Sequence, residues 1–466
     1  MSKILLVSPS QAASYGKMTP PSQIHMGLAY LASMVSSESV DIIDADSERM
    51  SQDAFADILR RKNYDIAGFT VTTPTLSSSL ALAKEVKNES PGTLVVFGGI
   101  HPTIRPHETI ANDCVDAVVR GEGELTFKEI VESLKNGRGL SGIKGLIYKK
   151  GGKTEEEGPR PLISDLDSIP FPARHLFKNK EYTYPDALYR NTAPIITSRG
   201  CPGFCTYCNA NQIFTRAFRA RSARNVADEI EFLTKEMKIR EIHIWDDNFT
   251  MIKKRVFEIR DEILKRGVRA KFAFPNGVRA DFLDREMLGA LKEMGTYSLA
   301  LCVESGSQEV LNKARKGIRL EKVEEVFALA KEMRLETWAF FMIGLPGEDA
   351  STIRKTIDFA KRMDPDIAKF HILKPYPGTE VYDYLKEKKF VLTEDYDQFG
   401  IHTPPIHRLE TLSSSDMLEW QKKAYASFYF RPGKIAKQVL RIKTFNRFIL
   451  NLQAGFGLTK MVLSKN

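Results

Sequence analysis

Short apolar runs alternate with longer amphipathic stretches over the first 140 residues of the chain. The runs with strand character are KILLVSP, VDIIDAD, DIAGFTVTT and LVVFGG, and the stretches with helical spacing include GLAYLASMVSS, DAFADILRRKN and SSLALAKEVKN. Strands that alternate with helices predict a parallel sheet, because each parallel neighbour is reached through a crossover helix. Residues 1–140 are therefore predicted to form an α/β domain with a doubly wound, Rossmann-like sheet.

The segments that follow these strands are rich in Ser, Thr and Gly. In open parallel sheets ligands bind at the carboxyl ends of the strands, so the segments predict a binding edge that admits a broad ligand. A histidine at such an edge is typical of a turn residue bonded to the backbone, and a contact to a bound cofactor is the alternative. The candidate residues of this edge are Ser8, Thr70, Thr72, Thr73, Gly98, Gly99, His101, Gly121 and Glu122.

The pattern changes at residues 141–190, where turn residues, charge and proline predict a β-hairpin and a linker. A second series of alternating strands and helices then fills residues 191–400. Its six apolar runs are PIITSRG, EIHIWDDN, AKFAFPN, YSLALCVES, WAFFMIG and AKFHILKP. Six such units predict a partial (β/α)6 TIM-like barrel, in which the segments after the strands carry the chemistry.

Residues 401–466 are predicted to form a small helical region that ends in a basic amphipathic tail. Ten Lys or Arg and no Asp or Glu lie between Trp420 and Asn466, which accounts for the formal net charge of +9. A basic charge confined to one tail does not favour nucleic-acid binding. The tail predicts either a docked helix or contact with an anionic membrane or with an acidic, lipid-like or polyanionic substrate. Its periodic apolar positions are Ile435, Val439, Ile442, Phe445, Ile449 and Leu452.

The overall composition favours a soluble, cytoplasmic protein. Apolar residues make up 42% and charged residues 27%, and no apolar run is long enough to span a membrane. The opening MSKILLVSPS resembles a strand rather than a secretory signal. Five cysteines are few and odd in number for a disulfide framework, which favours a reducing compartment. Two of them, Cys114 and Cys302, are interpreted as core thiols.

The other three cysteines, Cys201, Cys205 and Cys208, are spaced CxxxCxxC directly after a predicted strand. Three thiolates on one tight loop suit three irons of a cubane cluster and leave the fourth iron open for a reactant. Zinc is the alternative metal. Zinc prefers four ligands, however, and the next histidine along the chain is the distant His243.

The segment GCPGFCTYC resembles the cysteine motif of the radical S-adenosylmethionine (SAM) superfamily. The resemblance implies that the three cysteines hold a 4Fe-4S cluster whose open iron is chelated by SAM. It also implies SAM contacts from the aromatic residue before the third cysteine and from the segments WDDNF, ESGS and IGLPGE. In this sequence those residues are Tyr207, Asp246, Asp247, Asn248, Glu304, Ile343, Gly344 and Pro346.

The segments GFTVTTPT, FGGIHPT and RGEGELTF extend the resemblance to the cobalamin-dependent branch of this superfamily. They imply that the ligand edge of residues 1–140 binds cobalamin, although the sequence lacks the DxHxxG motif of histidine-ligated cobalamin domains. In this branch an external electron donor, such as flavodoxin or ferredoxin, supplies the electron for SAM cleavage, and methylcobalamin supplies a methyl group.

The resemblance implies methylation of an unactivated carbon in a small-molecule or lipid substrate. A cyclisation or rearrangement without net methyl transfer, as in anaerobic porphyrin-ester cyclases, is the alternative reaction. A corrinoid-binding sensor or electron carrier is a third possibility, and it is disfavoured because it needs none of the expected SAM contacts. Which residues are catalytic is not evident from the sequence.

Overall fold

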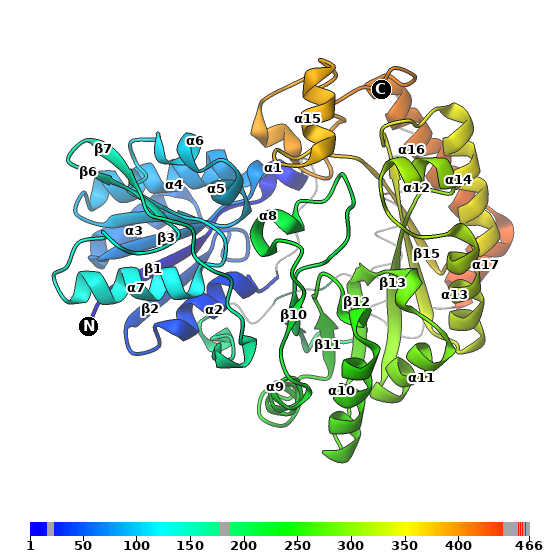
Figure 1. Cartoon of the computed structure of the whole chain (residues 1–466), viewed down its shortest axis with the longest axis horizontal. Coiled ribbons are helices and arrows are strands. Elements are labelled where there is room, and N and C mark those ends of the chain that lie inside the picture. The colour runs from blue at the N-terminus through cyan, green and yellow to red at the C-terminus, as the bar shows by residue number, and fades with distance from the viewer. Residues whose placement is uncertain are drawn as a thin grey trace.

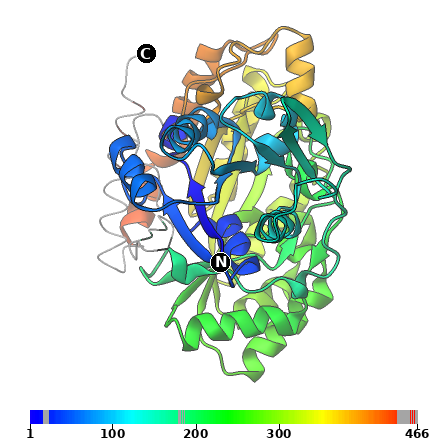
Figure 2. The ribbon, with the colours of Figure 1, turned by 90° about the vertical axis from the view of Figure 1, so that its left-hand side faces the viewer.

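The computed structural model describes residues 1–15, 23–177 and 187–440, together with six isolated positions beyond these ranges. Two sheets, each accompanied by helices, form the two halves of the molecule, with the N-terminal half on the left of Figure 1 and the C-terminal half on the right. Figure 2, turned by 90°, shows the N-terminal half in front of the C-terminal strands. This arrangement confirms the predicted fold class.

The N-terminal sheet has seven strands in the order β2-β1-β3-β4-β5-β6-β7, and its first five strands are parallel. Apolar side chains of the sheet pack into two separate buried clusters, because helices cover both of its faces. The strands are β1 (Lys3–Ser8), β2 (Ser39–Asp44), β3 (Ile66–Thr70), β4 (Leu94–Gly98), β5 (Ala117–Val119), β6 (Leu146–Lys150) and β7 (Lys153–Glu156). The helices are α1 (Ala12–Tyr15), α2 (Met26–Met34), α3 (Gln52–Arg61), α4 (Leu76–Glu89), α5 (Ile100–Ile104), α6 (Pro106–Ile110) and α7 (Glu124–Lys135).

The hairpin predicted after residue 140 is present as β6 and β7, and it extends the N-terminal sheet. Strand β6 pairs antiparallel with β5, which is only three residues long and fully buried. The hairpin thus covers the edge that β5 would otherwise leave exposed. The sequence pattern did not reveal β5, because three residues are too few to show a period.

The C-terminal half is a six-stranded parallel sheet in the order β15-β14-β13-β12-β11-β8, so that consecutive βα units are neighbours. Alternate apolar residues of its strands pack with the helices in the largest buried cluster of the described chain. The strands are β8 (Thr192–Ile195), β11 (Glu241–Ile244), β12 (Lys271–Val278), β13 (Thr296–Glu304), β14 (Glu336–Ile343) and β15 (Ile367–Ile372). The helices are α9 (Ala223–Lys235), α10 (Lys253–Lys265), α11 (Arg285–Met294), α12 (Gln308–Lys313), α13 (Leu320–Glu332) and α14 (Ala350–Met363).

Helix α16 (Ser414–Tyr429) covers the edge strand β15 of this sheet. Side chains of the helix bond to backbone groups of the strand: the Tyr425 hydroxyl accepts from Phe370 N at 3.2 Å, and the Tyr429 hydroxyl donates to Ala368 O at 2.9 Å. Polar side chains on α16 thus take the place of a further strand. The C-terminal region also contains α15 (Glu380–Glu387) and α17 (Pro432–Leu440).

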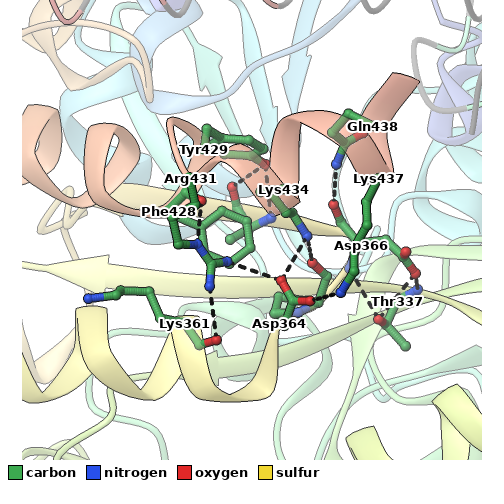
Figure 3. Close-up of polar contacts among 12 residues, drawn as sticks. Thr337, Lys361, Asp364, Asp366, Phe428, Tyr429, Arg431, Lys434, Lys437 and Gln438 are labelled. Atoms are coloured by element: carbon green, nitrogen blue, oxygen red, sulfur yellow. Dashed lines mark hydrogen bonds and ion pairs between the residues drawn. The ribbon is translucent and has the colours of Figure 1, made fainter. Parts of the chain in front are cut away.

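Helix α17 is the start of the predicted basic tail, and its cations dock onto Asp364 at the end of α14 (Figure 3). Arg431 Nη2 lies 3.0 Å and Lys434 Nζ 3.4 Å from the Asp364 carboxylate, and Lys437 pairs with the same group. The Lys434 side chain is 2% exposed, so this contact is buried. These contacts support the docked interpretation for residues 431–438. The apolar positions from Ile442 onward lie outside the described residues.

No helix in the described ranges combines the length and the apolar character that a membrane span requires.

We expect Asp364→Asn to loosen α17, because Lys434 would remain buried without its carboxylate. A charge-assisted hydrogen bond is worth roughly 1.5–3 kcal/mol, so trypsin should cleave around residues 431–437 about tenfold faster in the folded variant. Asp358→Asn, which removes an exposed ion pair on the same helix, is the matched control and should leave the cleavage rate unchanged. Equal cleavage of both variants would show that Asp364 does not hold the helix.

Candidate functional site

The three clustered cysteines lie on a loop, here called the cysteine loop (residues 200–209), that follows β8 and the short strand β9 (Ser198–Arg199). Strand β9 pairs with β10 (Arg219–Ala220), which returns the chain after α8 (Ala210–Phe214). Gly200 has φ +85°, and a Cβ there would lie 2.2 Å from the carbonyl oxygen of Ala217. Only glycine fits this approach, so the loop leaves the strand at a fixed point.

The backbone of the cysteine loop brings the thiols toward one another. A Cβ on Gly203 would lie 3.4 Å from Cys201 Sγ and 3.9 Å from Cys205 Sγ, so the absence of a side chain leaves room beside both sulfurs. Cys208 N donates to Cys205 O at 3.3 Å, which closes a turn around the second and third cysteines. In the described part of the chain, no three His, Cys, Asp or Glu side chains are already gathered around one point.

Burial favours the protonated form of two thiols of the cysteine loop, those of Cys201 and Cys208. Burial raises the pKa of Cys201, and burial together with Cys205 raises the pKa of Cys208 to about 11. A metal that binds thiolates must displace these protons, which a strongly thiophilic metal does. The loop geometry and the donor type therefore fit an iron–sulfur cluster.

The acidic pair after β11 ties the ends of β11 and β8 together. Asp246 accepts hydrogen bonds from Thr197 N at 2.6 Å and from the hydroxyls of Thr197 and Ser198 at 2.5 Å. Asp247 accepts one from Gly200 N at 2.9 Å and thereby holds the first residue of the cysteine loop. Burial and the neighbouring Asp246 raise the pKa of Asp247. Asn248 is buried next to this pair, and the SAM contact predicted for the three residues stays a prediction.

A buried ion pair lies at the end of β13. Glu304 has φ +69° and accepts from Lys316 Nζ at 2.8 Å, and the two side chains are 10% and 6% exposed. Burial alone would lower the pKa of Lys316, but Glu304 outweighs it and raises that pKa. The Tyr207 ring centroid lies 6.0 Å from the same ammonium. The predicted SAM residues Tyr207 and Glu304, from separate segments, are thus brought together at one site.

Cys302 was interpreted from the sequence as a core thiol, and this interpretation is wrong. Its side chain is only partly buried, and its Sγ donates to Asn276 O at 3.6 Å on the inner face of the sheet. Burial and Glu304 raise its pKa to about 12, and Cys205 and Cys208 lie close enough to add to the effect. Glu304 and Lys316 both influence the Cys302 thiol, so this thiol lies near the buried ion pair. Cys114, by contrast, is buried in the N-terminal core as expected.

The turn after β14 is held by a buried carboxyl group that the sequence-based residue set omitted. Glu348 Oε2 accepts from Gly344 N at 2.7 Å and from Leu345 N at 3.1 Å, while His407 Nε2 lies 2.9 Å from Gly344 O. Burial raises the pKa of Glu348 to about 8. Gly344 has φ +95°, Ile343 is buried, and Pro346 is half-exposed on the same turn.

The elevated pKa makes Glu348 a source of pH-dependent stability. Between about pH 4.5 and 8 this carboxyl is ionised in the unfolded chain and protonated in the folded one, so stability falls as pH rises, by up to about 1.4 kcal/mol per pH unit. We expect Glu348→Gln to remove this loss, so that its melting temperature rises relative to the wild type between pH 5.5 and 7.5. Glu309→Gln, at an exposed acid, is the control. If the melting temperatures of the wild type and Glu348→Gln changed with pH in the same way, Glu348 would not be the source of this pH dependence.

The predicted edge residues of the N-terminal sheet fall into two groups. Gly99 has φ +108°, and a Cβ there would lie 2.8 Å from Val71 O, so glycine is required for the turn. His101 is fully buried, with Nδ1 3.3 Å from the Thr73 hydroxyl and its ring 4.9 Å from that of Tyr396. Burial lowers its pKa to about 4. The partly or fully exposed group is Thr70, Thr72, Gly98, Gly99 and Gly121, and the buried group is Ser8, Thr73, His101 and Glu122.

Glu122 does not face the open edge. Its carboxylate pairs with Arg199 at 2.7 Å and with Arg219 at 2.9 Å, and both arginines come from the strands that flank the cysteine loop. Burial opposes ionisation of Glu122, but the two arginines hold its pKa below the usual value. The contacts predicted between the edge residues and a corrinoid stay predictions, and for Glu122 the structure adds a link to the other half.

The C-terminal half contacts the ligand edge of the N-terminal sheet at further points. A Cβ on Gly400 would lie 2.2 Å from Ser14 Cα, and one on Gly378 would lie 2.7 Å from Ile104 Cγ2. Tyr396 donates to Glu108 at 3.1 Å. Helix α8, which follows the cysteine loop, contacts α5 and lies between the two halves in Figure 1. The cysteine loop and the ligand edge therefore belong to one region.

Family models match both halves of the chain. Residues 195–360 match the radical SAM superfamily, and residues 20–131 match the B12 binding domain. An uncharacterized methyltransferase of Pyrococcus horikoshii is 36% identical over 439 residues, 94% of each chain. The chain belongs to the radical SAM superfamily. With its B12-binding domain it is a cobalamin-dependent radical SAM enzyme, and this confirms the family and the SAM and cobalamin cofactors predicted from the sequence.

Other relatives of this radical SAM protein include a cyclase and solved structures. The anaerobic magnesium-protoporphyrin IX monomethyl ester cyclase of Rubrivivax gelatinosus is 26% identical, covering 97% of this chain and 82% of its own. The radical SAM methyltransferase TsrM of Kitasatospora setae superposes with a TM-score of 0.68 at 20% identity, over 83% of this chain and 75% of that chain. The cobalamin-dependent radical enzyme OxsB superposes with a TM-score of 0.74 at 16% identity, over 99% and 72%. These likenesses support the two-domain fold.

Proposed function

We propose that this radical SAM protein methylates an unactivated carbon of a small-molecule or lipid substrate. The observation that carries the proposal is the placement of the cysteine loop, at the carboxyl end of β8 and against the half that carries the B12-binding domain. Radical formation at SAM and methyl donation from cobalamin to the same substrate carbon would need both cofactors beside one substrate, and this arrangement is compatible with that. Relatedness to a methyltransferase over 94% of the chain supports the same reaction.

Different residues of the site would hold the iron–sulfur cluster and the cobalamin. Cys201, Cys205 and Cys208 would hold a 4Fe-4S cluster, and the backbone at Gly203 leaves space beside the sulfurs. When bound, the cluster with SAM would supply a carbon-centred radical, and cobalamin would supply the methyl group. Asp247 fixes the start of the loop through Gly200 N. Thr72 and Gly121, which are not buried, leave the ligand edge accessible to a corrinoid.

The Glu304–Lys316 ion pair would line the SAM site. The Glu304 carboxylate is largely buried and accepts from Lys316 Nζ at 2.8 Å, and its oxygens would also accept hydrogen bonds from a bound ligand. The partly buried Cys302 thiol lies near this pair. An external reductant such as flavodoxin or ferredoxin would supply the electron.

Radical cyclisation without methyl transfer is the second candidate function, and the 26% identity to the Rubrivivax cyclase over 97% of the chain favours it. The two reactions differ in the mass of the product. Methylation adds about 14 Da, whereas cyclisation removes hydrogen atoms. If the substrate is a lipid, the proposal also includes contact of the basic tail with a membrane surface.

The test uses SAM with a deuterated methyl group, the reconstituted protein, and small-molecule and lipid extracts under anaerobic conditions. We expect a labelled product and 5′-deoxyadenosine from the wild type. Cys201→Ala, Cys205→Ala and Cys208→Ala should form neither, because an incomplete ligand set cannot retain the cluster. Cys114→Ala, in the N-terminal core, is the matched control and should retain both activities. Formation of 5′-deoxyadenosine by a loop variant would overturn the cysteine assignment, and an unlabelled product with fewer hydrogens would favour the cyclase.

A further inference from the structure

Four buried charged side chains join the two halves of the molecule directly beside the cysteine loop. Glu122 and Glu124 lie at the start of α7 in the N-terminal half, and Arg199 and Arg219 face each other on β9 and β10. Arg199 Nη1 lies 2.7 Å from Glu122, and its Nη2 lies 2.5 Å from Glu124. Arg219 Nη1 lies 2.9 Å from Glu122. The four side chains are between 3% and 11% exposed.

The two acids determine the orientation of Arg199. A guanidinium group that donates from two nitrogens to two carboxylates is restricted in direction as well as in position. Arg199 is followed by Gly200, whose N–H is held by Asp247 and whose Cα lies against Ala217 O. The next residue is Cys201. Only Arg199 and Gly200 separate the two acids from the first cysteine. A displacement of Glu122 or Glu124 would therefore be transmitted to Cys201 through a short, tightly packed stretch of backbone.

The same acidic segment borders the ligand edge of the N-terminal sheet. Gly121 has φ +73°, and no atom of the described residues lies within 4 Å of a Cβ placed on it. Its N–H donates to the Thr103 hydroxyl at 3.0 Å, which anchors the segment to the end of α5. Gly121 thus faces open space where a ligand of the edge would lie, and the next residue, Glu122, turns inward to the arginines.

We propose that Glu122 and Glu124 are positioning residues that fix the distance between the cysteine loop and the corrinoid edge. Buried ion pairs contribute little net stability compared with apolar contacts, but they restrict geometry strongly. Two cofactors that act on one substrate carbon need such restricted geometry, because a displacement of about 1 Å costs about a hundredfold in rate. The corrinoid part of this inference rests on the proposed function, whereas the ordering of the loop does not.

The first test measures hydrogen exchange of the peptide that spans residues 196–210 in the protein without cofactors. In the double variant Glu122→Gln/Glu124→Gln, we expect the Gly200 region to exchange about tenfold faster, because two charge-assisted bonds of Arg199 are weakened. Arg199→Lys keeps the charge but cannot span both acids, so its exchange should lie between those of the wild type and the double variant.

Glu129→Gln is the matched control, because Glu129 also lies on α7 and pairs with Arg160 without a contact to the cysteine loop. Its loop should exchange as in the wild type. If the double variant does not fold, the single variant Glu124→Gln replaces it, because Glu122 still neutralises Arg199 there. The cysteine loop of Glu124→Gln should exchange hydrogen faster than that of Glu129→Gln. Wild-type exchange in the folded double variant, or in Glu124→Gln, would overturn the proposal.

The second test uses the reconstituted holoenzyme and electron paramagnetic resonance of cob(II)alamin beside the reduced cluster. Magnetic relaxation depends steeply on the distance between the two centres, so the wild type and Glu129→Gln should show one relaxation rate. Glu124→Gln, which leaves the predicted corrinoid contact Glu122 in place, should bind the same iron and cobalt and show a broadened distribution of rates. A single wild-type rate would refute the positioning role. Absence of iron or cobalt from all the proteins would instead refute the proposed function and leave the exchange result to decide the ordering of the loop.

Discussion

The ion pairs of Arg199 are the contact on which the arrangement of the site depends. They bring the last strand residues before the cysteine loop against the first turn of α7, and all participating side chains are buried. A charge buried there without a partner would be costly, so the two halves are held in one register. The packing of Gly400 on Ser14 and of Gly378 on Ile104 adds contacts that tolerate no larger residue.

Within the barrel, the polar residues at the strand ends mostly hold one another. Asp246 binds the end of β8, Asp247 binds Gly200, and Glu348 closes its own turn. Such bonds give the backbone a fixed shape around a cofactor site before any cofactor arrives. The Glu304–Lys316 ion pair likewise stabilises the backbone at the end of β13, and its Lys316 ammonium lies near the Tyr207 ring. These carboxyl groups therefore stabilise the backbone of the site.

The sequence predicted most of the alternation of strands and helices along the chain, because short apolar runs separated by amphipathic stretches are typical of parallel sheets. It also predicted the cysteine loop, whose spacing is local. It could not show that Glu122 turns toward Arg199 or that His101 is covered by Tyr396, because these contacts join residues far apart in the chain. Cys302 was misjudged because a lone cysteine carries no pattern of its own in the sequence.

The most direct test of the central claim is metal analysis of the full chain, reconstituted and purified without oxygen, for iron, sulfide, zinc and cobalt in one sample. Three cysteine ligands and a B12-binding domain predict about four irons and about one cobalt per chain. Iron without cobalt would preserve the radical enzyme but contradict methyl transfer through a corrinoid. Zinc without iron would contradict the account as a whole.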